Sequence, residues 1–137
     1  MSEANKSIAR DYIEGAWNRK DMNTVNRLID AKHVANGPFS DEMPQGIEGA
    51  KAFLNTFVSA FPDVHATIER QEVDGDRVIS YVTFAGTQSG QLMDIPPTGK
   101  KTTVPVKITD RIVNGKIVET WSEWDPDDLM RQLGVQR

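Results

Sequence analysis

Asp125 is the residue whose type and position best suit acid/base chemistry. It follows Trp124 directly and continues an alternating pattern with Glu119, Trp121 and Glu123. Because alternate residues of a strand point to the same side, we expect these side chains to share one face. A carboxylate beside an aromatic wall loses hydration, so its pKa rises toward neutrality. If this face lines a pocket, Asp125 can remove a proton from an activated carbon and is predicted to be catalytic.

Asp125 also has the features of a helix start. Pro126 occupies the first helical position, and Asp127 and Asp128 fall in the first turn. An aspartate N-cap contributes about 0.5–2 kcal/mol, which by itself explains the residue. The sequence therefore leaves a catalytic and a capping role for Asp125 open.

Aromatic and polar side chains elsewhere could build the pocket around this carboxylate. Flat aromatic walls suit an apolar or aromatic ligand, and hydrogen-bond donors can hold a developing oxyanion. The aromatic members are equally explained as ordinary core residues, and Gln88 and Arg111 are further donor candidates. The predicted substrate-binding residues share a ring or a hydrogen-bonding group, and are Tyr12, Trp17, Asn36, Phe57, Phe61, Tyr81, Trp121 and Glu123.

The sequence predicts neither a metal site nor a bound cofactor. Cysteine is absent, which excludes thiolate catalysis, disulfides and cysteine-based zinc sites. His33 and His65 have no recognisable ligand spacing. Asp74-Gly75-Asp76 lacks the remaining ligands of a calcium loop and is read as a turn.

Length and charge narrow the class of protein. The 137 residues suit one domain, predicted to span residues 1–137, with room for one small-molecule cavity. The net charge of −4 argues against binding to nucleic acid or to an anionic membrane surface. No apolar run approaches the roughly 20 residues that cross a bilayer. The N-terminus has no apolar signal core, so we expect a cytoplasmic protein.

The elements that must position these residues change in type along the chain. Apolar residues at helical spacing predict one helix containing Tyr12 and Trp17, a second capped by Asp21, and a third running from Ala50 to Phe61. The segment 34–49 is rich in Gly, Pro and Asn and is predicted to be a loop. A short last helix is expected from Pro126 to about Leu133, ending at Gly134.

The second half alternates with a period of two and predicts a meander of four strands. Asn114-Gly115 is a strong hairpin signal, and the segment 90–99 contains Pro96-Pro97 and is expected to be a loop. The predicted fold is α+β: a cone-shaped barrel in which a curved antiparallel sheet wraps around three N-terminal helices, followed by a short C-terminal helix. The strands are expected at Val64–Val73, Arg77–Thr87, Lys101–Val113 and Lys116–Trp124.

Four stretches carry a resemblance to a known family over nearly the whole chain. The chain resembles the SnoaL-like polyketide cyclases, whose fold is shared with nuclear transport factor 2. The stretches occur in the family's order and at its separations, and are Trp17-Asn18-Arg19-Lys20-Asp21, Phe61-Pro62-Asp63, Ile95-Pro96-Pro97-Thr98-Gly99-Lys100, and Asn114-Gly115-Lys116-Ile117-Val118-Glu119 followed by Trp121 and Trp124-Asp125.

The resemblance implies a cofactor-free intramolecular aldol condensation that closes a ring in a polyketide-type ester. It also implies a homodimer, and by motif position it makes Asp125 the acid/base. The chain departs from the family at two places. Asn36 stands where a histidine often precedes the loop proline, with His33 three positions earlier, and the segment 101–113 contains no histidine.

Two other functions stay open at this point. A non-catalytic protein could use the same pocket to bind an apolar ligand, which the missing histidines favour. An epoxide hydrolase or isomerase on the same fold could use Asp110, Arg111 and Asp125. Asp110 and Arg111 are adjacent in a predicted strand, however, and cannot both face the pocket without a bulge.

Overall fold

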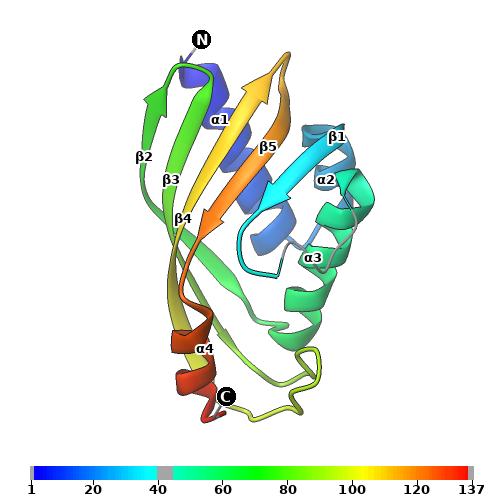
Figure 1. The fold of residues 1–137 in the computed structure, drawn as a ribbon, viewed down its shortest axis with the longest axis vertical. Coiled ribbons are helices and arrows are strands. Elements are labelled where there is room, and N and C mark those ends of the chain that lie inside the picture. The colour runs from blue at the N-terminus through cyan, green and yellow to red at the C-terminus, as the bar shows by residue number, and fades with distance from the viewer. Residues whose placement is uncertain (1, 40–44, 136–137) are drawn as a thin grey trace.

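The computed structural model describes residues 2–39 and 45–135 (Figure 1). Helices and strands follow the order that the sequence predicts, with one additional strand between the second and third helices. Their bounds are α1 Ser2–Tyr12, η1 Ile13–Asn18, α2 Met22–Leu28, β1 Ile29–Asn36, α3 Gly46–Ala60, β2 His65–Asp74, β3 Arg77–Thr87, β4 Lys101–Val113, β5 Lys116–Glu123 and α4 Pro126–Leu133.

The first predicted helix changes its winding halfway. α1 continues directly into η1, a π-helix in which the amide of Arg19 donates to the carbonyl of Glu14, five residues back. Gly15 lies against Thr24 of α2, where a Cβ atom would come within 2.9 Å of the Thr24 Cγ2 methyl group. α2 begins as predicted, because the Asp21 side chain accepts a 3.0 Å hydrogen bond from the amide of Asn23.

The five strands form one mixed sheet in the order β1-β5-β4-β3-β2. β2, β3, β4 and β5 pair with one another in an antiparallel meander, as the hairpin signals predict. The prediction of a loop over 34–49 is wrong at both ends. Residues 34–36 belong to β1, which pairs in parallel with β5 at the edge of the sheet, and residues 46–49 belong to α3. Residues 40–44 of that predicted loop lie outside the described residues.

The pairing of β1 depends on a partner that is remote in sequence. Val34, Ala35 and Asn36 pair with Glu119, Thr120 and Trp121, and the register is irregular between Ile29 and Val34. β1 shows no clean alternation, since the consecutive residues Ala31 and Lys32 are both exposed and the buried position after them is the polar His33. An edge strand of this kind is stabilised by backbone hydrogen bonds to β5 rather than by its own hydrophobic pattern.

The helices α1, α2 and α3 cover one face of the curved sheet, and α4 lies beyond the end of β5 (Figure 1). Inward-facing sheet residues pack against the helices in clusters such as Ile13, Ala66 and Val82. The sheet is not closed, so the architecture is the predicted α+β cone with an open side. None of the helices in the described part of the chain is both long and apolar enough to cross a bilayer.

Candidate functional site

A cavity of about 170 Å³ lies between the helices and the inner face of the sheet. Its wall is contributed by α1, η1 and α3 on one side and by β1, β3, β4 and β5 on the other. Most of the lining is apolar, and its polar side chains include Tyr12, His33, Asp110, Thr120 and Ser122. A ligand in this cavity therefore meets an apolar wall with only a few hydrogen-bonding groups.

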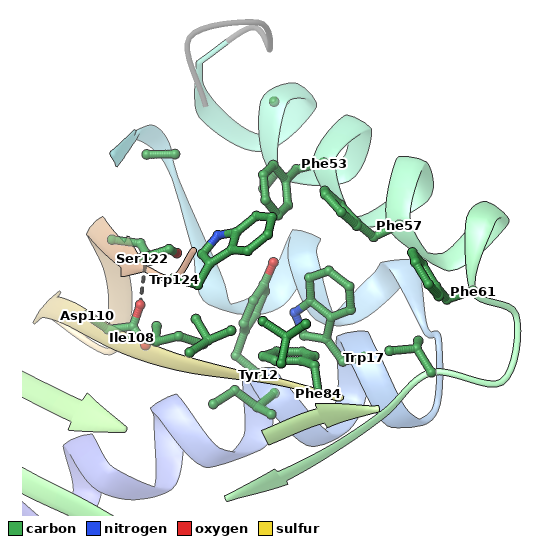
Figure 2. Close-up of a pocket in the computed structure, with 18 of the residues that line it drawn as sticks. Tyr12, Trp17, Phe53, Phe57, Phe61, Phe84, Ile108, Asp110, Ser122 and Trp124 are labelled. Carbon is green, nitrogen blue, oxygen red and sulfur yellow. Dashed lines mark hydrogen bonds between the residues drawn. The ribbon is translucent and has the colours of Figure 1, made fainter. Parts of the chain in front are cut away.

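Aromatic rings surround a large part of the cavity (Figure 2). Trp17 packs edge-to-face against Phe84, with ring centroids 5.1 Å apart, and contacts Phe53 at 6.4 Å. Phe57 continues the wall, at 5.0 Å from Phe53 and 6.2 Å from Trp124. These rings form a continuous aromatic surface drawn from η1, α3, β3 and the end of β5.

The π-helix explains how Tyr12 and Trp17 both reach the cavity. They are five positions apart in the sequence, a separation that an α-helix would place on different faces. The i to i+5 hydrogen bonding of η1 widens the turn and brings residues five apart closer to one face. Both side chains consequently line the cavity.

Asp110 is a buried carboxylate in the cavity wall. It lies on the inner face of β4, paired with Val78 of β3 and Thr120 of β5, and its exposed fraction is 2%. Burial raises the pKa of Asp110 to about 7, although the hydrogen bond from Thr120 opposes this change. Asp110 therefore takes up and releases protons near neutral pH, as a general base must.

Thr120 connects Asp110 to His33. The Thr120 hydroxyl donates a 2.8 Å hydrogen bond to Asp110 Oδ1, and His33 Nε2 lies 2.8 Å from the same hydroxyl oxygen. His33 is 4% exposed. Its burial lowers the pKa to about 4, while the carboxylates of Glu119 and Asp30 favour the charged form. His33 is thus a neutral imidazole at physiological pH.

Tyr12 places a neutral hydroxyl in the same cavity. Burial raises the pKa of the phenol above its ordinary value, and the negative charge of Asp110 adds to the effect. The hydroxyl points into the cavity and has no hydrogen-bond partner among the described residues (Figure 2). It can donate a hydrogen bond to a ligand oxygen.

Asp125 does not face the cavity, contrary to the expectation for a catalytic carboxylate. Its side chain is 63% exposed and lies 3.6 Å from Arg131 Nη2. Asp125 Oδ1 accepts a 3.0 Å hydrogen bond from the amide of Asp127 and caps α4, while the preceding Trp124 lines the cavity. Of the two roles that the sequence left open, the geometry shows the helix cap.

A β-bulge explains why the predicted face of β5 is the wrong one. Arg111 pairs with Glu119 but Ile112 pairs with Ile117, so Val118 is an extra residue in β5. Ile117 is fully buried. If the strand alternated without interruption from Ile117, the side chains of Glu119, Trp121 and Glu123 would point into the cavity. The bulge reverses the alternation, and the residues that face inward are Thr120, Ser122 and Trp124.

The predicted substrate-binding residues divide into two groups. Tyr12, Trp17, Phe57 and Phe61 lie in the cavity wall. The other four lie away from it and have partners elsewhere. Asn36 donates to Glu119 Oε2 at 3.1 Å, Tyr81 lies under the Arg70 guanidinium, Trp121 lies under that of Arg77, and Glu123 pairs with Lys107 at 3.7 Å.

The remaining predicted donors are also occupied elsewhere. Gln88 is buried in the loop after β3, where its side chain bonds Thr98 and the carbonyls of Ile95 and Pro96. Arg111 is 3.9 Å from both Glu119 and Asp76. Asp110 and Arg111 take opposite faces of β4, as neighbours in a strand must, so they do not form a joint set with Asp125.

From the sequence, Asp110 is a candidate only in the alternative epoxide hydrolase or isomerase, and His33 has no predicted role in the site. The signal for Asp110 was the alternation of the segment 101–113, where it is the one acidic residue at the positions shared by Thr102, Val104, Val106, Ile108 and Ile112. His33 had no such signal, because its inward position depends on the irregular pairing of β1. No three histidine, aspartate or glutamate side chains gather as metal ligands in the part of the chain that the structure describes.

Comparison with known proteins identifies the family. The model of the SnoaL-like polyketide cyclases matches residues 7–133. No curated protein matches the chain. Among solved structures, IdmH from Streptomyces antibioticus, named as a candidate polyketide cyclase, is 30% identical, with a TM-score of 0.80 over 96% of this chain and 99% of its own.

Two further structures show the same fold. TsrD from Streptomyces laurentii is 25% identical, with a TM-score of 0.88 over 99% of this chain and 98% of its own. A candidate SnoaL-like polyketide cyclase from Jannaschia sp. CCS1 is 20% identical, with a TM-score of 0.86 over 100% and 96%. The match of the family model over almost the whole described chain shows that this protein belongs to the SnoaL-like polyketide cyclase family.

Proposed function

We propose that this protein closes a ring in a polyketide-type ester by intramolecular aldol condensation, with Asp110 as the general base. The observation that carries the proposal is the position of Asp110. It is the only carboxylate among the described residues of the cavity wall, it is buried among apolar groups, and its pKa is raised to about 7. The family membership and the likeness to IdmH support a cyclase.

The proposed reaction needs one base and one hydrogen-bond donor. The ionised Asp110 takes a proton from a carbon flanked by carbonyl groups, leaving an enolate. The Tyr12 hydroxyl donates to the enolate oxygen and stabilises its charge. The enolate carbon then attacks a second carbonyl of the same molecule. A carbon–carbon bond forms, and the proton held by Asp110 returns to the new alkoxide oxygen.

The aromatic wall contributes by restricting the shape of the substrate. An open-chain polyketide is flexible, and ring closure requires its two reacting carbons to meet. A cavity lined by Trp17, Phe53 and Phe84 favours a compact, folded conformer of the substrate, because this conformer stacks on the rings and buries its apolar surface. Such a wall suits a substrate whose product is aromatic or polycyclic.

A panel of aromatic polyketide esters tests this function. Wild type is expected to convert at least one ester to a cyclised product of unchanged mass or of the mass less water, detected by liquid chromatography and mass spectrometry. Asp110→Asn should abolish conversion, whereas Asp125→Asn is the matched control on an exposed carboxylate. Undiminished conversion by Asp110→Asn would exclude Asp110 as the base. Tight binding of every ester with no conversion by wild type would make the cavity a binding site.

We further propose that two copies pair through the outer face of the sheet. This face carries Tyr81 and Trp121 beneath arginine side chains, together with residues of both charges such as Lys107 and Glu123. A surface with both signs of charge can be complementary to itself when two copies meet about a two-fold axis. Light scattering of the purified protein should give twice the monomer mass, and Trp121→Glu should lower it toward the monomer mass.

A further inference from the structure

The hydrogen-bonded chain of His33, Thr120 and Asp110 crosses three elements of the fold. His33 comes from the edge strand β1, Thr120 from β5 and Asp110 from β4. Both links measure 2.8 Å. All three residues line the cavity, so the chain runs along its wall rather than across the solvent-exposed surface.

The chemistry of the middle residue fixes the direction of these hydrogen bonds. A threonine hydroxyl has one proton and can donate to only one partner at a time. An ionised Asp110 accepts only, so the Thr120 proton lies on Asp110 Oδ1, as the structure has it. The Thr120 oxygen must then accept from His33, which requires a proton on His33 Nε2.

We propose that His33 is a positioning residue: its Nε2–H holds the Thr120 hydroxyl in the orientation that donates to Asp110 and thereby keeps Asp110 in the ionised form that the base needs. Without this donor the Thr120 hydroxyl can rotate away from Asp110. The buried carboxylate would then lose a hydrogen bond that favours its charged form. The inference deepens the proposed function, since it concerns the group that would act as the base.

Within this hydrogen-bonded chain, the titrating proton is bound by Asp110 and not by His33. Burial raises the pKa of Asp110 and lowers that of His33, so a proton prefers Asp110 to His33. His33 consequently stays neutral while Asp110 titrates. The titratable groups facing the chain are Tyr12 from α1, beside Asp110, and Glu119 from β5 and Asp30 from β1, beside His33.

The test is a direct titration of Asp110, which needs no substrate. The carboxyl carbon of Asp110 is followed by nuclear magnetic resonance between pH 5 and 9, and Asp110→Asn identifies its signal. His33→Leu and Thr120→Val are expected to raise the midpoint by about half a unit to one unit, because each removes the donor that favours the charged form. His33→Gln and Thr120→Ser restore a neutral donor at the same place and are expected to return the midpoint to the wild-type value.

Two results would overturn the proposal. One is a midpoint that is equal in wild type and in folded His33→Leu. The other is an equal rise in His33→Leu and His33→Gln, since that would trace the effect to the shape of the ring rather than to its N–H. Nitrogen nuclear magnetic resonance of the His33 imidazole is an independent test, because the proposal requires the Nε2–H tautomer at pH 8. Because these measurements need no turnover, a protein that cyclises no ester could still confirm or refute the role of His33.

Discussion

Asp110 and Thr120 face each other across β4 and β5, and the Thr120 hydroxyl donates a 2.8 Å hydrogen bond to Asp110 Oδ1. Through this hydrogen bond, β5 stabilises the charged form of Asp110, the one carboxylate of the described cavity wall. It exists because the bulge at Val118 turns Thr120 inward. The position and protonation of Asp110 therefore depend on the register of the sheet as well as on burial.

Turnover should depend on the ionisation of Asp110. With an esterified substrate that does not titrate, kcat/KM is expected to rise with pH, to be half-maximal near pH 7 and to level off about one unit higher, because the pKa of Asp110 in the free protein is about 7. Measuring initial rates from pH 5.5 to 8.5 gives the midpoint. A profile that is flat over this range would be inconsistent with Asp110 as the base.

Removing the Tyr12 hydroxyl should slow the chemical step. Tyr12→Phe keeps the ring in the cavity but deletes the donor to the enolate, and a single donor of this kind is worth about 100-fold to 1000-fold in kcat. KM should change much less, since the aromatic contacts stay. Phe84→Leu is the useful comparison, because it alters the wall without touching a hydrogen bond. Equal losses in the two variants would mean that the hydroxyl has no special role.

The buried groups should give opposite dependences of stability on pH. Asp110 has a raised folded pKa, so its contribution to stability is largest at low pH and is lost as the pH rises toward about 7. His33 has a lowered folded pKa, so its contribution is present above about pH 6.5 and is lost as the pH falls toward about 4. In wild type the two slopes partly cancel between these limits.

Single variants should separate these slopes in urea unfolding at pH 7.5 and 5. In His33→Gln, Asp110 is the remaining titrating group of the pair, and the free energy of unfolding is expected to rise by about 2–3 kcal/mol between pH 7.5 and 5. In Asp110→Asn, His33 is the remaining titrating group of the pair, and the free energy of unfolding is expected to fall by about 2 kcal/mol over the same change of pH. Changes of the same sign in both variants would show that these two groups do not govern stability in this range.

Asp125 should behave as a helix cap. Asp125→Ala is expected to lower the free energy of unfolding by about 1 kcal/mol, because the amide of Asp127 loses its acceptor. Asn caps nearly as well as Asp, so Asp125→Asn should be close to wild type in stability. Neither change should reduce turnover, which thermal denaturation and rate measurements on the same samples can check. A large loss of turnover in Asp125→Asn, with the stability of wild type, would show that Asp125 takes part in catalysis.

The contact between Gly15 and Thr24 should be needed for the π-helix. Gly15→Ala puts a methyl group against the Thr24 side chain and is expected to destabilise the fold by about 1–3 kcal/mol. Thr24→Ala removes both Oγ1 and Cγ2, and Thr24 Oγ1 has no hydrogen-bond partner among the described residues. The double variant should therefore recover much of the loss, with a coupling of about 1 kcal/mol or more in a double-mutant cycle. Additive effects would place the strain elsewhere.

Local interactions made much of the fold predictable. The turn at Asn114 and Gly115 has positive φ angles of 52° and 77°, which this dipeptide tolerates well. β3 and β4 have the predicted bounds, and α4 ends at Gly134 with φ 77° as its sequence indicates. Caps, turns and alternation depend on residues a few positions apart, so the sequence by itself determined the order and type of most elements.

The site was decided by tertiary structure. β1 needed β5 as a partner before its backbone could form a strand, and only that pairing brought His33 to Thr120. The bulge at Val118 is an extra residue in the pairing of two strands, and it reversed which side chains of β5 face the cavity. An alternating sequence shows which residues share a face, but the face that becomes the interior is chosen by the register between strands. Asp125 was therefore visible in the sequence as a carboxylate and a cap, whereas the buried carboxylate at Asp110 gained its chemistry only from the folded sheet around it.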